Sequence, residues 1–126
     1  MTAAPPPAKR ILVVEDDAFT RETLTTLLAI EGFTVTGAAN GQEALDQLRA
    51  GAAPDLILLD LMMPVKDGWQ FRREQAEDPA LASIPVVVVS AACDVGRKAA
   101  SIGAAGFLQK PVEPRVLLAA VRGHTS

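Results

Sequence analysis

Five short apolar runs, each followed by a stretch with helical spacing, constrain the fold of this chain more than any other feature. The runs lie at residues 11–14, 33–37, 55–60, 84–90 and 106–110, and the helical stretches at 18–31, 41–50, 67–77, 94–102 and 114–122. Most of the runs are continuously apolar, which is typical of strands buried on both faces of a parallel sheet. Strands that alternate with helices in this way predict an α/β fold with right-handed crossovers.

Five strand–helix units in a chain of 126 residues fit one domain. We predict the small doubly wound fold with a five-stranded parallel sheet of flavodoxin-like order 2-1-3-4-5. This domain is expected at residues 10–123, after a disordered Pro/Ala-rich lead-in at 1–9 and before a frayed tail at 124–126. Asn40 is expected to cap the second helix and Gly123 to end the last one. Ligands of such sheets bind outside the carboxyl ends of the strands.

The composition excludes several classes of protein. The net charge is −3 and no basic stripe is visible, which argues against direct nucleic-acid binding. No apolar run reaches the roughly 18 residues of a membrane span, and the N-terminus has no signal-peptide pattern. Cys93 is the single cysteine, so no internal disulfide is possible, and we expect a cytoplasmic protein.

Acidic side chains follow two of the predicted strands at the ends where ligands bind. Glu15, Asp16 and Asp17 come directly after the first strand, and Asp60 ends the third. If these strands are neighbours, the carboxylates converge, and their like charges raise each other's pKa values. A divalent cation removes the repulsion, and carboxylate, carbonyl and water oxygens are ligands that suit Mg²⁺. For Asp17, capping of the next helix is the favoured alternative to metal binding.

The fourth and fifth predicted strands end in Ser90 and Lys110, which add a hydroxyl and a positive charge. Together with a cation, these groups suit the three oxygens of a phosphoryl group, whose transfer depends mainly on positioning and charge neutralisation. Asp60 would then be the nucleophile that forms an aspartyl phosphate. Taken alone, Ser90 is more often a loop hydroxyl and Lys110 a solvated cation. The combination at four strand ends predicts a phosphoryl site.

Four segments resemble one known family: ILVVEDD at 11–17, DLILLDLMMPVKDGW at 55–69, IPVVVVSAA at 84–92 and GAAGFLQKPV at 103–112. Together they are similar to the receiver domain of bacterial two-component response regulators, the CheY-like family. The likeness covers essentially the whole chain after the lead-in. It implies that Asp60 accepts a phosphoryl group from a sensor histidine kinase or a histidine phosphotransfer protein.

The resemblance also implies a metal site. Asp16 would bind Mg²⁺ directly, and Glu15 would bind it directly or through a water molecule. The main-chain carbonyl of Met62 and the carboxylate of Asp60 would complete the protein ligands. Mn²⁺ would substitute for Mg²⁺ at such a site.

The resemblance assigns the remaining residues to phosphoryl binding and switching. Ser90 and Lys110 would contact the phosphoryl oxygens. Phe107 matches an aromatic switch position, which turns inward in the family as the hydroxyl residue moves toward the phosphoryl group. A downstream target protein would bind the face formed by the fourth helix, the fifth strand and the fifth helix. Gly96 lowers helix propensity, so the fourth helix is expected to be short.

A switch of this kind is not an enzyme that turns over a separate substrate. It would catalyse its own phosphorylation and only a slow autodephosphorylation, because neither Met62 nor Ala92 can orient an attacking water. Because the sequence ends soon after the fifth predicted helix, we expect a stand-alone receiver. Within the third predicted helix, Arg72 and Arg73 are expected on a solvated face. His124 is expected beyond the end of the last helix.

Two other interpretations of the function stay open. One is a phosphorylation-independent pseudo-receiver, an interaction module that would have lost an acidic residue or the lysine. The other is a receiver fragment of a larger hybrid kinase or regulator. A haloacid-dehalogenase-type phosphatase is disfavoured because Met62 stands where it needs a second aspartate. A flavodoxin-like flavin binder is disfavoured because acidic residues follow the first strand, where it needs a phosphate-binding loop.

Overall fold

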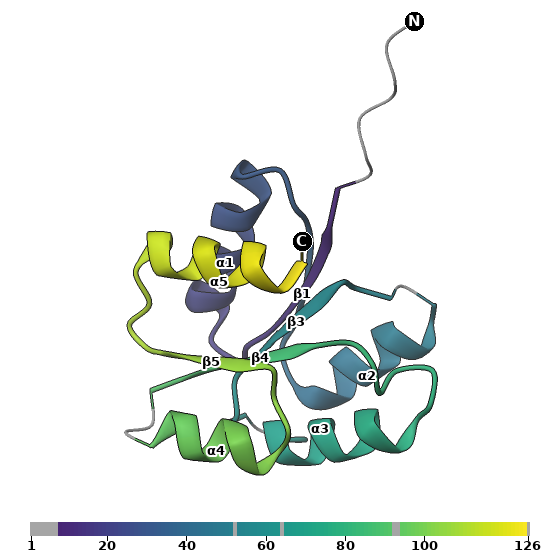
Figure 1. Ribbon diagram of the computed structural model, residues 1–126. Helices are drawn as coiled ribbons and strands as arrows, with labels where there is room; N and C mark the ends of the chain where they lie inside the picture. Colours follow the sequence, from purple (N-terminus) through teal and green to yellow (C-terminus); the bar gives the residue numbers. More distant parts are fainter. Residues whose placement is uncertain (1–7, 52, 64, 92–93, 126) are drawn as a thin grey trace, which may run out of the picture.

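Strands and helices alternate along the whole described part of the chain (Figure 1). The computed structural model describes residues 8–51, 53–63, 65–91 and 94–125. The strands are β1 (Arg10–Val14), β2 (Thr34–Ala38), β3 (Leu56–Leu59), β4 (Val86–Ser90) and β5 (Gly106–Gln109). The helices are α1 (Ala18–Ile30), α2 (Gly41–Arg49), α3 (Gly68–Glu77), α4 (Val95–Ser101) and α5 (Pro114–Thr125).

The five strands form one parallel sheet in the order β2-β1-β3-β4-β5, which confirms the predicted fold. The register pairs Val14 of β1 with Leu59 of β3, and Leu59 in turn with Val88 of β4. Ser90 at the end of β4 pairs with Gln109 of β5. The carboxyl ends of β1, β3, β4 and β5 therefore meet at one edge of the sheet, where the predicted site residues follow them.

Helices cover both faces of the sheet, with α1 and α5 on one face and α2, α3 and α4 on the other (Figure 1). Alternate residues of β1 enter two separate cores. Leu12 and Val14 join the core that contains Phe71 of α3, whereas Ile11 and Val13 join the core on the α1 and α5 side. Every residue of β3 and β4 is buried. This burial on both faces explains why these strands are continuously apolar.

Helix starts follow the capping rules. Asn40 accepts a hydrogen bond from the backbone N–H of Glu43, which confirms it as the cap of α2. Asp67 caps α3 in the same way and completes a capping box with Gln70. α4 has seven residues and is the shortest of the helices described, as the glycine within it predicted.

The C-terminal end differs from the prediction. We expected a helix over 114–122 and a frayed tail from 124, but α5 continues through Thr125. His124 lies within the helix. A Cβ atom at Gly106 of β5 would lie 3.1 Å from His124 Nε2, so the ring lies directly against that glycine. Thr125 is buried and donates its hydroxyl hydrogen bond to the carbonyl of Val121. Packing against the sheet therefore overrides the weak helix propensity of Gly123.

Some predictions concern residues that the structure does not describe. Most of the predicted lead-in, the last residue of the predicted tail, and Ala92 and Cys93 lie outside the described residues.

Arg72 differs from its expected solvated position, because its guanidinium donates hydrogen bonds to the carbonyls of Ile102 and Gly103. It thereby ties α3 to the turn before β5. No helix in the described part of the chain is long and apolar enough to cross a membrane.

Candidate functional site

The acidic residues of the site are placed by the backbone bonds at the ends of β1 and β3. The N–H of Glu15 donates to the carbonyl of Ala38 at the end of β2, at 3.0 Å. The N–H of Asp60 donates to the carbonyl of Val14 at the end of β1, also at 3.0 Å. These bonds hold both carboxyl-bearing residues as direct continuations of neighbouring strands. The topology thus brings together residues that lie 45 positions apart in the sequence.

Glu15, Asp16 and Asp60 form a compact carboxylate cluster, with one oxygen of each residue within 4.8 Å of the others. Glu15 and Asp60 are buried, whereas Asp16 is exposed. Burial and the nearby carboxyl of Asp60 raise the pKa of Glu15 from 4.5 to about 8, against the opposing effect of Lys110. Burial is thus the main cause of the raised pKa of Glu15, and the neighbouring carboxyl of Asp60 adds to it.

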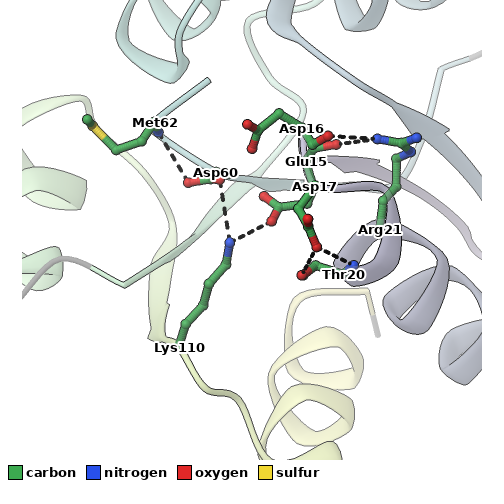
Figure 2. Close-up of polar contacts among 8 residues, drawn as sticks. All are labelled: Glu15, Asp16, Asp17, Thr20, Arg21, Asp60, Met62 and Lys110. Carbon is green, nitrogen blue, oxygen red and sulfur yellow. Dashed lines mark hydrogen bonds and ion pairs between the residues drawn. The ribbon is translucent and has the colours of Figure 1, made fainter. Parts of the chain in front are cut away.

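Lys110 bridges the two buried carboxylates (Figure 2). Its Nζ lies 2.7 Å from Glu15 Oε1 and 3.4 Å from Asp60 Oδ2. Its backbone N–H donates to the carbonyl of Ser90 at 2.8 Å, which fixes the end of β5 to the end of β4. Burial by itself lowers the pKa of Lys110, but the hydrogen bond to Glu15 and the charges of both carboxylates outweigh burial and raise it. The lysine is therefore held as a cation at the centre of the site.

Asp17 does not belong to the carboxylate cluster. Its Oδ2 accepts hydrogen bonds from the backbone N–H of Thr20 at 2.8 Å and from the Thr20 hydroxyl at 2.6 Å (Figure 2). These bonds lower the pKa of Asp17. The residue is the N-cap of α1, which confirms the capping interpretation.

Met62 contacts Asp60 directly, whereas Ser90 ends the strand next to β3. The backbone N–H of Met62 donates to Asp60 Oδ1 at 3.1 Å, while the Met62 side chain is 65% exposed (Figure 2). This bond orients the carboxylate from the side opposite Lys110. Ser90 is buried at the end of β4, the strand that pairs with β3. The structure thus gathers Ser90 with the acidic residues and the lysine at one edge of the sheet.

Phe107 lies apart from the carboxylates, on the α4 side of β5. Its side chain is 53% exposed. A Cβ atom at Gly96 of α4 would lie 3.0 Å from Phe107 Cζ, so the aromatic ring rests directly against the glycine. The ring therefore has an outward position over α4, in contact with the one residue of that helix that lacks a side chain.

Arg21 is a site residue that the sequence reasoning missed. Its Nη1 donates to the backbone carbonyl of Glu15 at 2.8 Å and to that of Asp16 at 3.4 Å (Figure 2). The residue belongs to the first turns of α1, and its guanidinium reaches back to the end of β1. The signal available in the sequence was an arginine six residues after Glu15. That spacing alone does not tell an inward-reaching side chain from a solvated one.

The donor set fits a hard divalent cation. All three side chains of the cluster offer carboxylate oxygens, which Mg²⁺ prefers. Glu15 Oε2 is buried and has no hydrogen-bond partner among the described residues. A buried carboxylate oxygen without a donor is costly unless a cation or another donor meets it. The raised pKa of Glu15 likewise indicates that burial and Asp60 disfavour its charged form more than Lys110 favours it.

A comparison with protein families identifies one match, to the response regulator receiver domain, over residues 11–122. The alkaline phosphatase synthesis transcriptional regulatory protein SphR of Synechococcus elongatus is 38% identical over 97% of this chain and 52% of its own length. The response regulator PleD of Caulobacter vibrioides is 39% identical over 92% of this chain and 26% of its own length. The chain thus spans about half the length of such relatives or less.

Solved structures share both the fold and detectable sequence identity. The chemotaxis response regulator CheY4 of Vibrio cholerae has a TM-score of 0.85 and is 28% identical, over 93% of this chain and 98% of that chain. A putative response regulator from Chloroflexus aurantiacus has a TM-score of 0.86 and is 31% identical, over 94% and 98%. The signal receiver domain of a histidine kinase from Syntrophus aciditrophicus has a TM-score of 0.85 and is 32% identical, over 94% and 90%.

Proposed function

The chain belongs to the response regulator receiver domain family, and we propose on this premise that Asp60 is its phosphoacceptor. The donor would be a phosphohistidine of a sensor histidine kinase or of a histidine phosphotransfer protein. One observation carries the proposal: Lys110 bridges Asp60 and Glu15 where β1, β3 and β5 end together. A lysine cation beside the nucleophilic carboxylate can neutralise the charge of an incoming phosphoryl group.

The transfer is a displacement at phosphorus. A carboxylate oxygen of Asp60 attacks the phosphorus atom and forms a P–O bond, while the P–N bond to the donor histidine breaks. The electron pair of that bond stays on the imidazole nitrogen, which takes up a proton. Asp60 is the fitting nucleophile because Lys110 and the N–H of Met62 contact its two oxygens and hold the carboxylate in one orientation.

Neutralisation of charge is the second task of the site. We propose that Glu15, Asp16, Asp60 and the main-chain carbonyl of Met62 hold Mg²⁺, or Mn²⁺ in its place. A bound divalent ion supplies positive charge that offsets the carboxylates and the incoming phosphoryl oxygens. Lys110 and the hydroxyl of Ser90 would bind those oxygens from the β4 and β5 side. The positions of both residues at the strand ends support this assignment.

Phosphorylation would act as a switch. Added charge at Asp60 would draw the hydroxyl of Ser90, and Phe107 would leave its outward position over α4 and turn inward. The surface of α4, β5 and α5 would then change its affinity for a target protein. The exposed ring of Phe107, in contact with α4, supports this proposal. The protein would have no separate substrate, and its aspartyl phosphate would hydrolyse slowly.

Two contexts for this switch differ in how the output leaves the domain. As a stand-alone receiver, the protein would bind a separate target. As the receiver part of a longer regulator, it would act on an attached domain. Relatives that the chain covers only in part include the DNA-binding response regulator MtrA of Mycobacterium leprae, which favours the second context as an alternative. We propose a receiver unit that begins at residue 10 in either case and that extends past the predicted end at 123, because α5 continues through Thr125.

Intact-mass measurement after incubation with acetyl phosphate tests the proposal. The wild type should gain the mass of one phosphoryl group when Mg²⁺ is present, and the Asp60→Asn variant should gain none. Asp17→Asn is the matched control, because it removes a neighbouring carboxylate while asparagine still caps α1. This control should be phosphorylated like the wild type. No gain in folded wild type would refute phosphoacceptance and favour the pseudo-receiver.

A further inference from the structure

Arg21 is a cationic side chain that contacts the main chain of Glu15 and Asp16. These two residues form the loop after β1 that carries proposed metal ligands, and we call it the metal-binding loop. The Nη1 of Arg21 donates to the carbonyl of Glu15 at 2.8 Å and approaches that of Asp16 at 3.4 Å. These carbonyls lie just beyond β1, where the strand pairing ends. Neither bond involves a carboxylate oxygen, so Arg21 leaves the proposed metal ligands available. It instead restrains the backbone from which two of the three clustered carboxylates extend (Figure 2).

The arginine is itself held in place from two sides. Its backbone N–H donates to the carbonyl of Asp17 at 2.9 Å, in the turn that Asp17 caps. Gly37 of β2 provides the space for its aliphatic stem. A Cβ atom at Gly37 would lie 3.1 Å from Arg21 Cδ and 3.3 Å from Cγ, tighter than ordinary van der Waals contact. The glycine therefore permits the path by which the side chain reaches the loop.

We propose that Arg21 is a positioning residue of the metal site, and that Gly37 provides the room for its side chain to reach the loop. This inference rests on the proposed function, because it concerns binding of Mg²⁺ at Glu15, Asp16 and Asp60. The guanidinium fixes the loop carbonyls, and the loop in turn presents the two carboxylates of Glu15 and Asp16 at the separation that the fold gives them. Groups that orient metal ligands commonly change metal affinity by about 10- to 100-fold when removed.

Positioning and simple charge predict opposite signs for the same substitution. If Arg21 acted only as a nearby positive charge, its removal would strengthen Mg²⁺ binding, because like charges repel. If it orders the loop, its removal weakens Mg²⁺ binding, because the carboxylates lose their preorganised arrangement. The direction of the change in affinity therefore decides between the two roles.

The experiment is an Mg²⁺ titration by calorimetry of folded protein, whose folded state is checked by circular dichroism. We expect Arg21→Ala to raise the Kd for Mg²⁺ by about tenfold or more. Arg21→Lys, which keeps the charge without the planar fork, should fall between Arg21→Ala and the wild type. Arg122→Ala is the matched control: it removes the same charge from α5, where Arg122 pairs with Glu31 at 2.9 Å, and should leave the Kd unchanged.

Gly37→Ala tests the second half of the proposal without touching the arginine. Its methyl group should displace the Arg21 stem and raise the Kd, by less than Arg21→Ala does. In the Arg21→Ala background the stem is gone, so Gly37→Ala should have no further effect. Should Arg21→Ala fail to fold, Gly37→Ala and Arg21→Lys still decide the question.

Three results would overturn these ideas in distinguishable ways. An Arg21→Ala variant with unchanged or tighter Mg²⁺ binding refutes the positioning role and leaves the proposed function standing. Additive effects of Gly37→Ala and Arg21→Ala refute the part assigned to Gly37 alone. Wild-type protein that binds no Mg²⁺ refutes the metal site, and with it both the proposed function and this inference.

Discussion

Glu15 shows how strongly a single residue depends on its neighbours in this site. Its carboxyl is buried next to Asp60, and only one of its oxygens meets Lys110. Burial and the second carboxyl raise its pKa to about 8. In the absence of metal, the folded protein therefore keeps a proton that an unfolded chain releases near its ordinary pKa of 4.5.

This difference predicts a pH-dependent stability for the metal-free protein. Between about pH 4.5 and 8 the folded state binds one proton more than the unfolded state, so the free energy of unfolding falls as the pH rises through that window. Urea denaturation across this range in a chelator measures the slope. The slope should disappear in Glu15→Gln and persist in Asp17→Asn, because the lowered pKa of Asp17 places its titration below the window. A slope that survives in Glu15→Gln would assign it to another group.

At the scale of elements, contact between α4 and β5 is the feature that links the site to the surface. Gly96 leaves room for the ring of Phe107, which rests against the helix backbone. Gly123 in α5 offers a natural comparison, because a Cβ atom there would meet nothing within 4 Å. The two glycines have the same intrinsic helix propensity but different surroundings.

The comparison predicts different outcomes for the same substitution. Gly123→Ala should stabilise the protein by up to about 1 kcal/mol through helix propensity alone. Gly96→Ala should gain less or lose stability, because its methyl group would meet Phe107 Cζ at 3.0 Å. In a Phe107→Ala background, where the ring is absent, Gly96→Ala should stabilise the protein about as much as Gly123→Ala does. Urea denaturation measures the free energy of unfolding of both glycine variants. Equal gains in this free energy would show that the ring of Phe107 does not hinder a methyl group at position 96.

The helices and strands also show which features of the fold local sequence patterns predict and which they do not. The order and identity of all ten elements followed from apolar runs, caps and glycines, because those signals are local. The end of α5 did not follow, because the placement of His124 against Gly106 and the burial of Thr125 depend on the folded chain. Arg72 and Arg21 were also missed in their roles. Each binds carbonyls that only the folded chain brings within reach.

For the molecule as a whole, the strand order decides where chemistry is possible. Because all five strands are parallel, their carboxyl ends lie at one edge of a sheet that is covered on both faces, and the strand order makes the ends of β1 and β3 neighbours. The sequence indicated this convergence, since it depends only on strand order and on which residues end the strands. It did not indicate the ion pairs of Lys110, nor the Glu15 oxygen that meets no donor among the described residues, because both depend on side-chain placement.

If the site works as proposed, this edge of the sheet directs a phosphoryl group to Asp60 and to no other carboxylate. Borohydride reduction of the phosphorylated protein converts an aspartyl phosphate to homoserine, and peptide mass spectrometry then locates it. After incubation with acetyl phosphate and Mg²⁺, we predict homoserine at position 60 alone. Homoserine at position 16 or 17, or a phosphorylated protein without homoserine at position 60, would contradict the claim.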